Sequence, residues 1–217
     1  MAWNFGAQIN SLTQFDGNNT NASEEGENYS TLASQWLKDA AREVINLLPM
    51  NLLKLCTAEE TFTSAAVGSE SETLNTGKIL SVFAGDYAAR EIPSHFKHKA
   101  NDPDSIEYAT TTDPVYYFEN NKINVLPSGI SCKYEEVAYP SVSYNAVDIS
   151  VFPDEAEYLV VLRAAITAAE YKLNFEEDPE IYVPIIQNLK QDYMTGLQAI
   201  GAVPAASPQA QAQAQGG

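Results

Sequence analysis

Residues 151–173 read VFPDEAEYLVVLRAAITAAEYKL, and this stretch decides how the rest of the chain is interpreted. Pro153 suits the first position of a helix, because its missing N–H would have no partner there. Acidic residues crowd the first turn and Lys172 stands in the last turn, and both signs complement the helix dipole. Only Arg163 and Thr167 interrupt an otherwise apolar circumference. Such a helix is normally buried, so we predict a core helix, since its charges argue against a membrane span.

The composition predicts a substantial core and an unusually acidic surface. The chain has 217 residues, of which 45% are hydrophobic, and it carries 29 acidic against 12 basic residues for a formal net charge of −17. A protein this acidic is not expected to bind nucleic acid by neutralising phosphates. It is not expected to bind an anionic membrane surface either.

Helical periodicity occurs at both ends of the chain. Residues 30–48 carry apolar side chains at every fourth position, and a short second helix is expected over residues 50–57. Residues 184–200 repeat the helical pattern before Gly201, which suits a helix C-cap.

The middle of the chain changes to the two-residue period of strands. The clearest unit is VYYFE-NN-KINVL, in which Asn120 and Asn121 tolerate the positive φ that a two-residue hairpin turn requires. Six candidate strands follow from this period, over residues 61–67, 78–84, 105–109, 115–119, 122–126 and 132–138.

These patterns predict an α+β fold in which an antiparallel β-rich region is inserted into a helical bundle. We expect residues 30–201 to form a single domain, with helices over about 30–57 and 153–200 and the β insertion over about 60–148. Residues 1–29 are predicted to be an extended arm with scattered apolar side chains. Residues 202–217 are low-complexity and are predicted to be disordered.

The two cysteines are interpreted as reduced. Cys56 and Cys132 lie far apart without metal-ligand spacing, so two buried thiols are favoured over a disulfide. The N-terminus lacks the basic region and apolar run of a signal peptide, so synthesis in a cytoplasm is expected.

Metal and cofactor sites are not predicted. His95 and His98 have a spacing that can hold zinc, but no second ligand motif accompanies them, so an exposed polar turn is favoured. Residues 16–27 resemble a calcium loop weakly, because Asn21 stands where the sharp turn requires glycine. A solvated acidic turn is the favoured interpretation.

No motif for nucleophilic catalysis, phosphate binding or dinucleotide binding occurs, and we predict that the chain is not an enzyme. Five tyrosines could form a sugar-binding shelf, although packing within a β-sheet is favoured. They are Tyr116, Tyr117, Tyr134, Tyr139 and Tyr144.

Four segments carry a resemblance to a known family: WLKDAAREVINLLP, DPVYYFENNKINVLP, YPSVSY and FPDEAEYLVVLRAAITAA. They resemble segments of small structural proteins of tailed-bacteriophage virions, and above all of the head-to-tail connector or adaptor proteins in the neck of marine and cyanobacterial phages. The similarity covers about residues 31–173, and neither the N-terminal arm nor the Gln/Ala tail has a counterpart in it.

This resemblance implies a homo-oligomeric ring in the virion neck, made in the host bacterial cytoplasm and joined to the portal and to tail or nozzle proteins. It implies about twelve copies, no membrane partner, and a channel through which double-stranded DNA passes without specific binding. The alternatives are another tail, baseplate or capsid accessory protein or, less favoured, a carbohydrate-binding module. The residues expected at interfaces are Trp3, Phe5, Phe15, Asn120 and Asn121.

Overall fold

The computed structural model describes residues 3–14, 29–66, 72–74, 78–174 and 179–202. The fold is α+β, as predicted. The sequence predicts one domain over residues 30–201, whereas the structure divides the chain into two compact units. The helical unit comprises Met1–Leu55 and Tyr139–Gly217, and the β unit comprises Cys56–Ala138.

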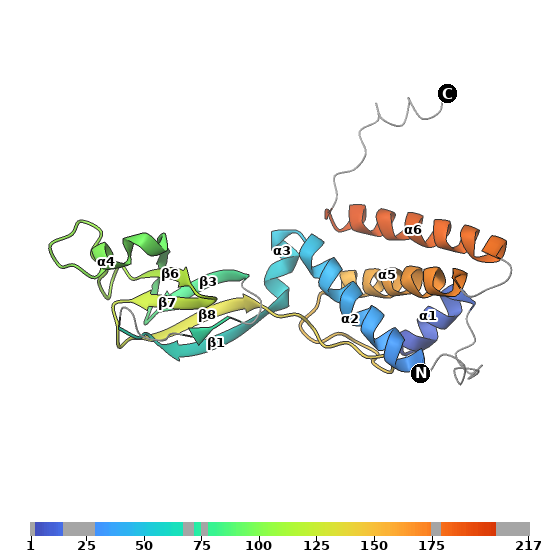
Figure 1. Cartoon of the computed structure of the whole chain (residues 1–217), viewed down its shortest axis with the longest axis horizontal. Coiled ribbons are helices and arrows are strands. Elements are labelled where there is room, and N and C mark those ends of the chain that lie inside the picture. The colour runs from blue at the N-terminus through green and yellow to red at the C-terminus, as the bar shows by residue number, and fades with distance from the viewer. Residues whose placement is uncertain (1–2, 15–28, 67–71, 75–77, 175–178, 203–217) are drawn as a thin grey trace, which may run out of the picture. The chain divides into compact units, whose positions relative to one another are not determined.

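The helical unit is organised around α5 (Asp154–Leu173), against which α1 (Phe5–Thr13), α2 (Tyr29–Leu47) and α6 (Tyr182–Ala199) pack (Figure 1). Pro153 immediately precedes α5, and its first turn carries three acidic residues. Ten residues of α5 are buried: Ala156, Leu159, Val160, Val161, Leu162, Ala164, Ala165, Ile166, Ala168 and Ala169. The prediction of a core helix is therefore confirmed.

The prediction of an extended N-terminal arm is wrong for residues 5–13, because they form α1. Asn4 caps this helix by accepting a hydrogen bond from the Ala7 N–H at 2.8 Å. Phe5 and Ile9 are buried, and α1 packs against α5. The short helix is stable because its apolar face is covered, a tertiary effect that local composition does not reveal.

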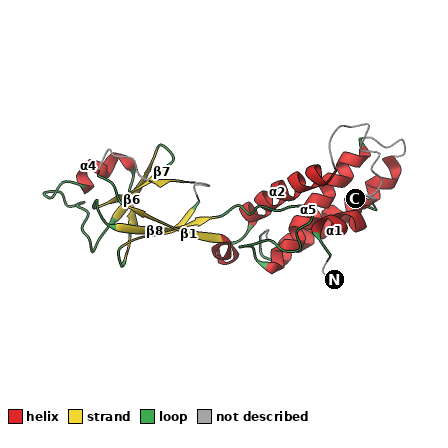
Figure 2. Cartoon of the chain, turned by 90° about the horizontal axis from the view of Figure 1, so that it is seen from below, coloured by secondary structure: helices red, strands yellow, loops and turns green. Residues whose placement is uncertain are grey.

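The β unit contains two four-stranded sheets, which Figure 2 shows as yellow arrows. The first sheet has the order β1 (Thr57–Thr63), β8 (Ser131–Val137), β3 (Ile79–Ala84), β4 (Tyr87–Ala88). The second has the order β2 (Glu72–Thr73), β7 (Lys122–Leu126), β6 (Val115–Glu119), β5 (Arg90–Glu91).

Strand alternation gives the second sheet two buried faces. One face contributes Ile123 and Val125 to a core shared with Val82 and Tyr134 of the first sheet. The opposite face contributes Val115, Tyr117 and Leu126 to a second core, which η2 (Ser94–Phe96) and α4 (Lys97–Ala100) help to cover. The β unit is therefore layered as sheet, sheet and helical turn.

One detail of the predicted β region is wrong. Residues 105–109 form turns and not a strand, because their backbone bonds close a loop. The sheets are rich in antiparallel pairs, as predicted, and β5 adds a short parallel pair with β6. The other predicted strands correspond to β1, β3, β6, β7 and β8, with β1 beginning at Thr57 instead of residue 61.

The remaining elements are short. Pro49 ends the first long helix region, after which α3 (Met50–Leu53) and η1 (Lys54–Cys56) lead to β1, and η3 (Pro179–Ile181) precedes α6. Within the described ranges, no helix is long and apolar enough to cross a membrane. The predicted disorder of the tail falls almost wholly on residues 203–217, outside the described part of the chain.

Candidate interaction surfaces

Three aromatic residues near the N-terminus were expected at interfaces, and the structure describes the exposure of two of them. Trp3 is 61% exposed and remains available for a partner. Phe5 is only 2% exposed, because the first turn of α1 packs into its own helical unit, and its role at an interface stays a prediction. Phe15 lies outside the described residues.

Asn120 and Asn121 form the predicted turn between β6 and β7. Both residues adopt positive φ, 53° and 59°, as a two-residue hairpin turn requires. Asn121 also fixes the preceding β2 segment, since its backbone oxygen accepts from the Leu74 N–H at 3.2 Å and its side-chain amide donates to the Leu74 oxygen at 3.3 Å. The turn thus has a structural role, and its role at an interface stays a prediction.

A loop of the β unit, residues 101–113, is held in one conformation by backbone bonds. The Ala109 N–H donates to the Ala100 oxygen at 2.8 Å, which brings the two ends of residues 100–109 together. Ala100 and Ala109 are each 1% exposed and belong to the core below the loop. The loop therefore resembles compact surface loops whose ends are closed and packed.

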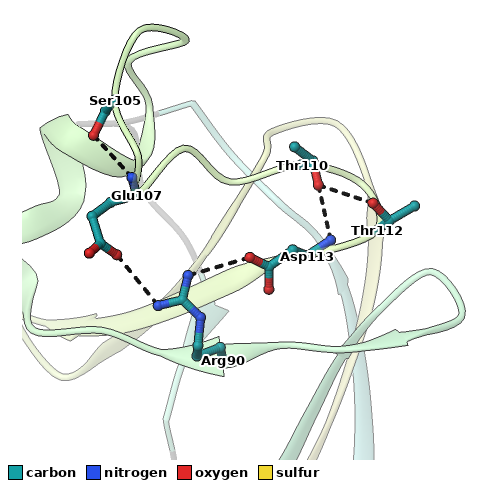
Figure 3. A network of polar contacts seen from close by, with 6 residues as sticks. All are labelled: Arg90, Ser105, Glu107, Thr110, Thr112 and Asp113. Carbon is teal, nitrogen blue, oxygen red and sulfur yellow. Dashed lines mark hydrogen bonds and ion pairs between the residues drawn. The ribbon is translucent and has the colours of Figure 1, made fainter.

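Arg90 fixes the same loop from β5, as Figure 3 shows. Its guanidinium lies 3.6 Å from Glu107 and 3.4 Å from Asp113, so one cation bridges two carboxylates that are six residues apart. The Thr110 hydroxyl accepts from the Asp113 N–H at 3.0 Å, and the Ser105 hydroxyl accepts from the Glu107 N–H at 3.2 Å. We call Arg90, Glu107 and Asp113 the Arg90 clamp.

The clamped loop presents apolar side chains to solvent. Ile106 is 101% exposed and Tyr108 is 39% exposed. Both lie between Ala100 and Ala109, which are joined by a backbone hydrogen bond. A fully exposed isoleucine gains nothing in an isolated subunit, whereas it can gain about 2 kcal/mol when a partner covers it. We define Ile106 and Tyr108 as the loop surface, the first candidate for contact with another protein.

The two histidines are placed on a separate turn at the start of this region. His95 and His98 are exposed on η2 and α4, as the sequence analysis expected. Among the described residues, no group of three or more His, Cys, Asp or Glu side chains could hold a metal ion. The adjacent Lys97 donates to both carboxylate oxygens of Glu119 at 2.7 and 2.8 Å, and this hydrogen bond raises the pKa of Lys97.

One polar network crosses the helical unit. Arg163 on α5 donates to Glu43 on α2 at 2.7 Å, and Tyr193 on α6 donates to the second oxygen of the same carboxylate at 3.3 Å. Arg163 also donates to Thr167 at 3.1 Å, so these two polar residues of the central helix bond to each other. Burial and, next, the charge of Glu43 raise the pKa of Tyr193. The network therefore links α2, α5 and α6 and has a structural role.

The five tyrosines do not form a common shelf, since they are distributed over three environments. Tyr116 and Tyr134 pack at the core between the two sheets, and Tyr117 lies in the core under α4. Tyr139 and Tyr144 belong to the helical unit, where the Tyr144 hydroxyl accepts from Asn10 at 3.1 Å. Packing was the favoured interpretation for these residues, and it holds for the three in the β unit.

Both cysteines are buried thiols and are not joined in a disulfide. Cys56 and Cys132 are each 0% exposed, and Cys132 donates to the Ile130 oxygen at 3.4 Å. Burial raises the pKa of Cys56 to about 11. A thiol with a raised pKa is a poor nucleophile at neutral pH, so neither position is a candidate for catalysis.

Sequence reasoning missed the Arg90 clamp and the loop surface. Periodicity cannot reveal them, because residues 101–113 have neither a helical nor a strand period. The composition held one signal, since Arg90 precedes a loop that is rich in acidic residues. The four acidic residues of this loop, residues 101–113, are Asp102, Asp104, Glu107 and Asp113. The partners of Glu43 were also missed, because Arg163 and Tyr193 lie 120 and 150 residues away from it in sequence.

No known protein family and no curated protein sequence matches this chain.

Proposed function

We propose that this chain is a structural protein of a tailed-bacteriophage virion, which forms a ring in the neck and joins the portal to the tail. The observation that carries the proposal is where the motifs of the resemblance fall. WLKDAAREVINLLP lies on α2, DPVYYFENNKINVLP spans the β6–β7 hairpin, and FPDEAEYLVVLRAAITAA covers most of α5. The likeness therefore concerns the scaffold of both units.

The surfaces of the two units support the same proposal. A ring subunit needs contact surfaces for neighbouring copies, the portal and the tail or nozzle proteins. Trp3 and the loop surface expose large apolar side chains, and the Arg90 clamp holds the loop in place. Pre-organised apolar anchors lower the entropic cost of association.

The charge of the chain fits a channel through which DNA slides. Double-stranded DNA carries about one negative charge per 1.7 Å of its axis, so a basic lining would retain it by counterion release. A subunit with a net charge of −17 supplies acidic side chains that repel the duplex from the wall. The competing explanation is that this charge only keeps a large assembly soluble.

The decisive experiment is to locate the chain in a density map of the whole particle. We expect it as a closed ring between portal and tail, with about twelve copies. Density for the chain in the baseplate, in tail fibres or on the capsid surface would replace the neck by another structural role. A purified chain that stays monomeric, binds glycans and has no density in the particle would remove the structural proposal altogether.

The lubricating role of the acidic surface has its own test. Once the map identifies the carboxylates that face the channel, they are changed to lysine. Slower DNA ejection from particles that assemble normally supports the role, because the lining would then attract phosphates. Normal ejection from such particles would leave solubility as the function of the charge.

A further inference from the structure

β1 lies at the edge of the first sheet. In the described residues its only strand partner is β8, with which it pairs in antiparallel register from Thr57 opposite Val137 to Thr63 opposite Ser131. The Ala138 N–H donates to the Cys56 oxygen and the Ser64 N–H donates to the Ile130 oxygen, each at 2.9 Å. Even-numbered residues of this segment therefore make the bonds to β8.

The odd-numbered residues must then direct their backbone groups away from β8, because bonded and non-bonded pairs alternate in an antiparallel ladder. Glu59, Thr61 and Thr63 thus present their N–H and C=O groups at the outer edge of the sheet. Within the part of the chain that the structure describes, these backbone groups have no partner. An unpaired edge of this length is a template for an added strand.

The side chains of β1 restrict what can be added. The strand TAEETFT contains neither proline nor lysine, the residues that commonly block edges. It carries Glu59 and Glu60, and Lys133 neutralises only Glu59, at 3.1 Å between exposed groups. A second β1 would gather four carboxylates on one narrow ribbon, and like charges on neighbouring strands are destabilising. The edge therefore favours a strand without acidic side chains.

We propose that residues 209–215 of a neighbouring copy of this chain, QAQAQAQ, pair with β1 as an added strand. This stretch has no charge, no proline and a strict two-residue alternation, and with seven residues it matches the length of β1. The inference rests on the proposed function, since a ring requires contacts between copies.

The length and start of the tail suit this role. Residues 203–217 lie outside the described residues and follow α6, which ends at Ala199 in the helical unit. Six residues, 203–208, separate the last described residue from the alternating stretch, and they can span roughly 20 Å when extended. Pro204 and Pro208 favour an extended spacer over a helix. Fully extended, this spacer would carry residues 209–215 away from the end of α6.

Alternation then decides which face of the added strand carries which side chains. One face of the added strand carries only glutamines and the other only alanines. Glutamines on the face of Glu59 place amide donors beside its carboxylate, and alanines fall on the face of Phe62, which packs against the core between the sheets. A slip by one residue exchanges the two faces, so the favoured registers are those with glutamines beside Glu59.

Two proline substitutions test the pairing in the full-length chain. Thr61→Pro removes an N–H that points outward, so the bonds between β1 and β8 remain intact. Ala212→Pro blocks the middle of the added strand, and Ala205→Pro, in the spacer, is its matched control. We expect Thr61→Pro and Ala212→Pro each to weaken self-association about tenfold in sedimentation or mass photometry. Ala205→Pro is expected to leave it unchanged, and thermal melting checks that all three variants fold.

Amide hydrogen exchange gives a readout that a stability effect would not reproduce. The amides of Glu59, Thr61 and Thr63 should exchange rapidly in the dilute monomer and become protected as the chain associates. In the Ala212→Pro variant this protection should be absent. A synthetic peptide of residues 203–217 should restore it, whereas the same peptide with Ala212→Pro should not.

Several results would overturn the pairing. They are protection of these amides already in the monomer, association that is insensitive to both prolines, a chain that stays monomeric at every concentration, and a peptide that leaves exchange unchanged. The neck assignment is decided separately by density in the particle. A neck ring whose β1 edge is bare would refute the added strand while the proposed function stands.

Discussion

The helical unit and the β unit reach stability by different routes. In the helical unit a single helix, α5, packs against three others, so one apolar surface serves several interfaces. In the β unit the second sheet separates two smaller cores, and each strand contributes alternate residues to one side or the other. A substitution in α5 therefore affects its packing against three helices, whereas a substitution in the second sheet affects the core on one face only.

The largest effect is expected from Ile166→Asp in α5. Ile166 is 2% exposed, so the substitution buries an unpaired carboxylate among apolar neighbours. We expect the free energy of unfolding of the helical unit to fall by about 4 kcal/mol. Urea denaturation followed by far-ultraviolet circular dichroism measures this change. Gln187→Asp adds the same charge to an exposed position of α6 and serves as control; equal midpoints for the two variants would contradict the central role of α5.

Gly6→Ala tests how the N-terminal helix is attached. A Cβ atom at this position would overlap the aromatic ring of Tyr144, while the Gly6 N–H donates to the Tyr144 oxygen at 2.9 Å. We expect a loss of about 2 kcal/mol in unfolding free energy from this overpacking. Ser11→Ala, on the exposed side of the same helix, is the control. If Gly6→Ala stabilises the protein through helix propensity alone, α1 does not pack against this ring.

Alkaline pH should weaken the β unit. Burial raises the pKa of Cys56 to about 11 from 9.0 and that of Tyr134 to about 12 from 10.0, so the folded state holds both protons more tightly than the unfolded state. Their stabilising effect is complete below pH 9 and is lost as the pH rises toward 12. For Tyr134 we expect a loss of about 2 kcal/mol between pH 10 and 12.

Denaturation of the Tyr134→Phe variant across the same pH range checks this expectation. The variant cannot ionise at position 134, so its stability should fall less steeply above pH 10 than that of the unsubstituted chain. Parallel curves for the two proteins would show that Tyr134 does not titrate differently in the folded and unfolded states.

The smallest effect is expected from Arg90→Gln. The clamp lies at the surface, where ion pairs contribute about 0–1 kcal/mol, so the unfolding free energy should change by less than about 1 kcal/mol. Hydrogen exchange in residues 101–113 should nevertheless accelerate, because the loop loses its link to β5. Lys133→Gln breaks another exposed ion pair of the β unit and is the matched control. Unchanged exchange in the loop would show that its backbone bonds alone hold it.

Local pattern was a good guide where one period dominates. The β6 and β7 strands were predicted at their observed bounds, and the positive φ of both turn asparagines followed from the turn length. α1 was missed because Phe5 and Ile9 are stabilised by a helix more than 140 residues away in sequence. The β5 strand has two residues, too few for any period to be recognised.

The candidate surfaces divide in the same way. The exposed Trp3 could be named from the sequence, whereas Phe5, two residues later, is buried by a partner helix that composition does not reveal. The loop surface depends on Arg90 meeting carboxylates 17 and 23 residues further along. Such a meeting is set by how the strands pair.

The sequence by itself determined the acidic charge, the buried character of α5 and the alternation of the hairpin strands, because these depend on residue type and on spacing within one element. Only the tertiary structure decided that the chain divides at residues 56 and 138, that the second sheet is covered on both faces, and that β1 lies at an edge. The physical reason is that strand order and helix contacts depend on which distant surfaces bury one another. A local pattern predicts that an apolar face is buried, but the segment that buries it is known only from the tertiary structure.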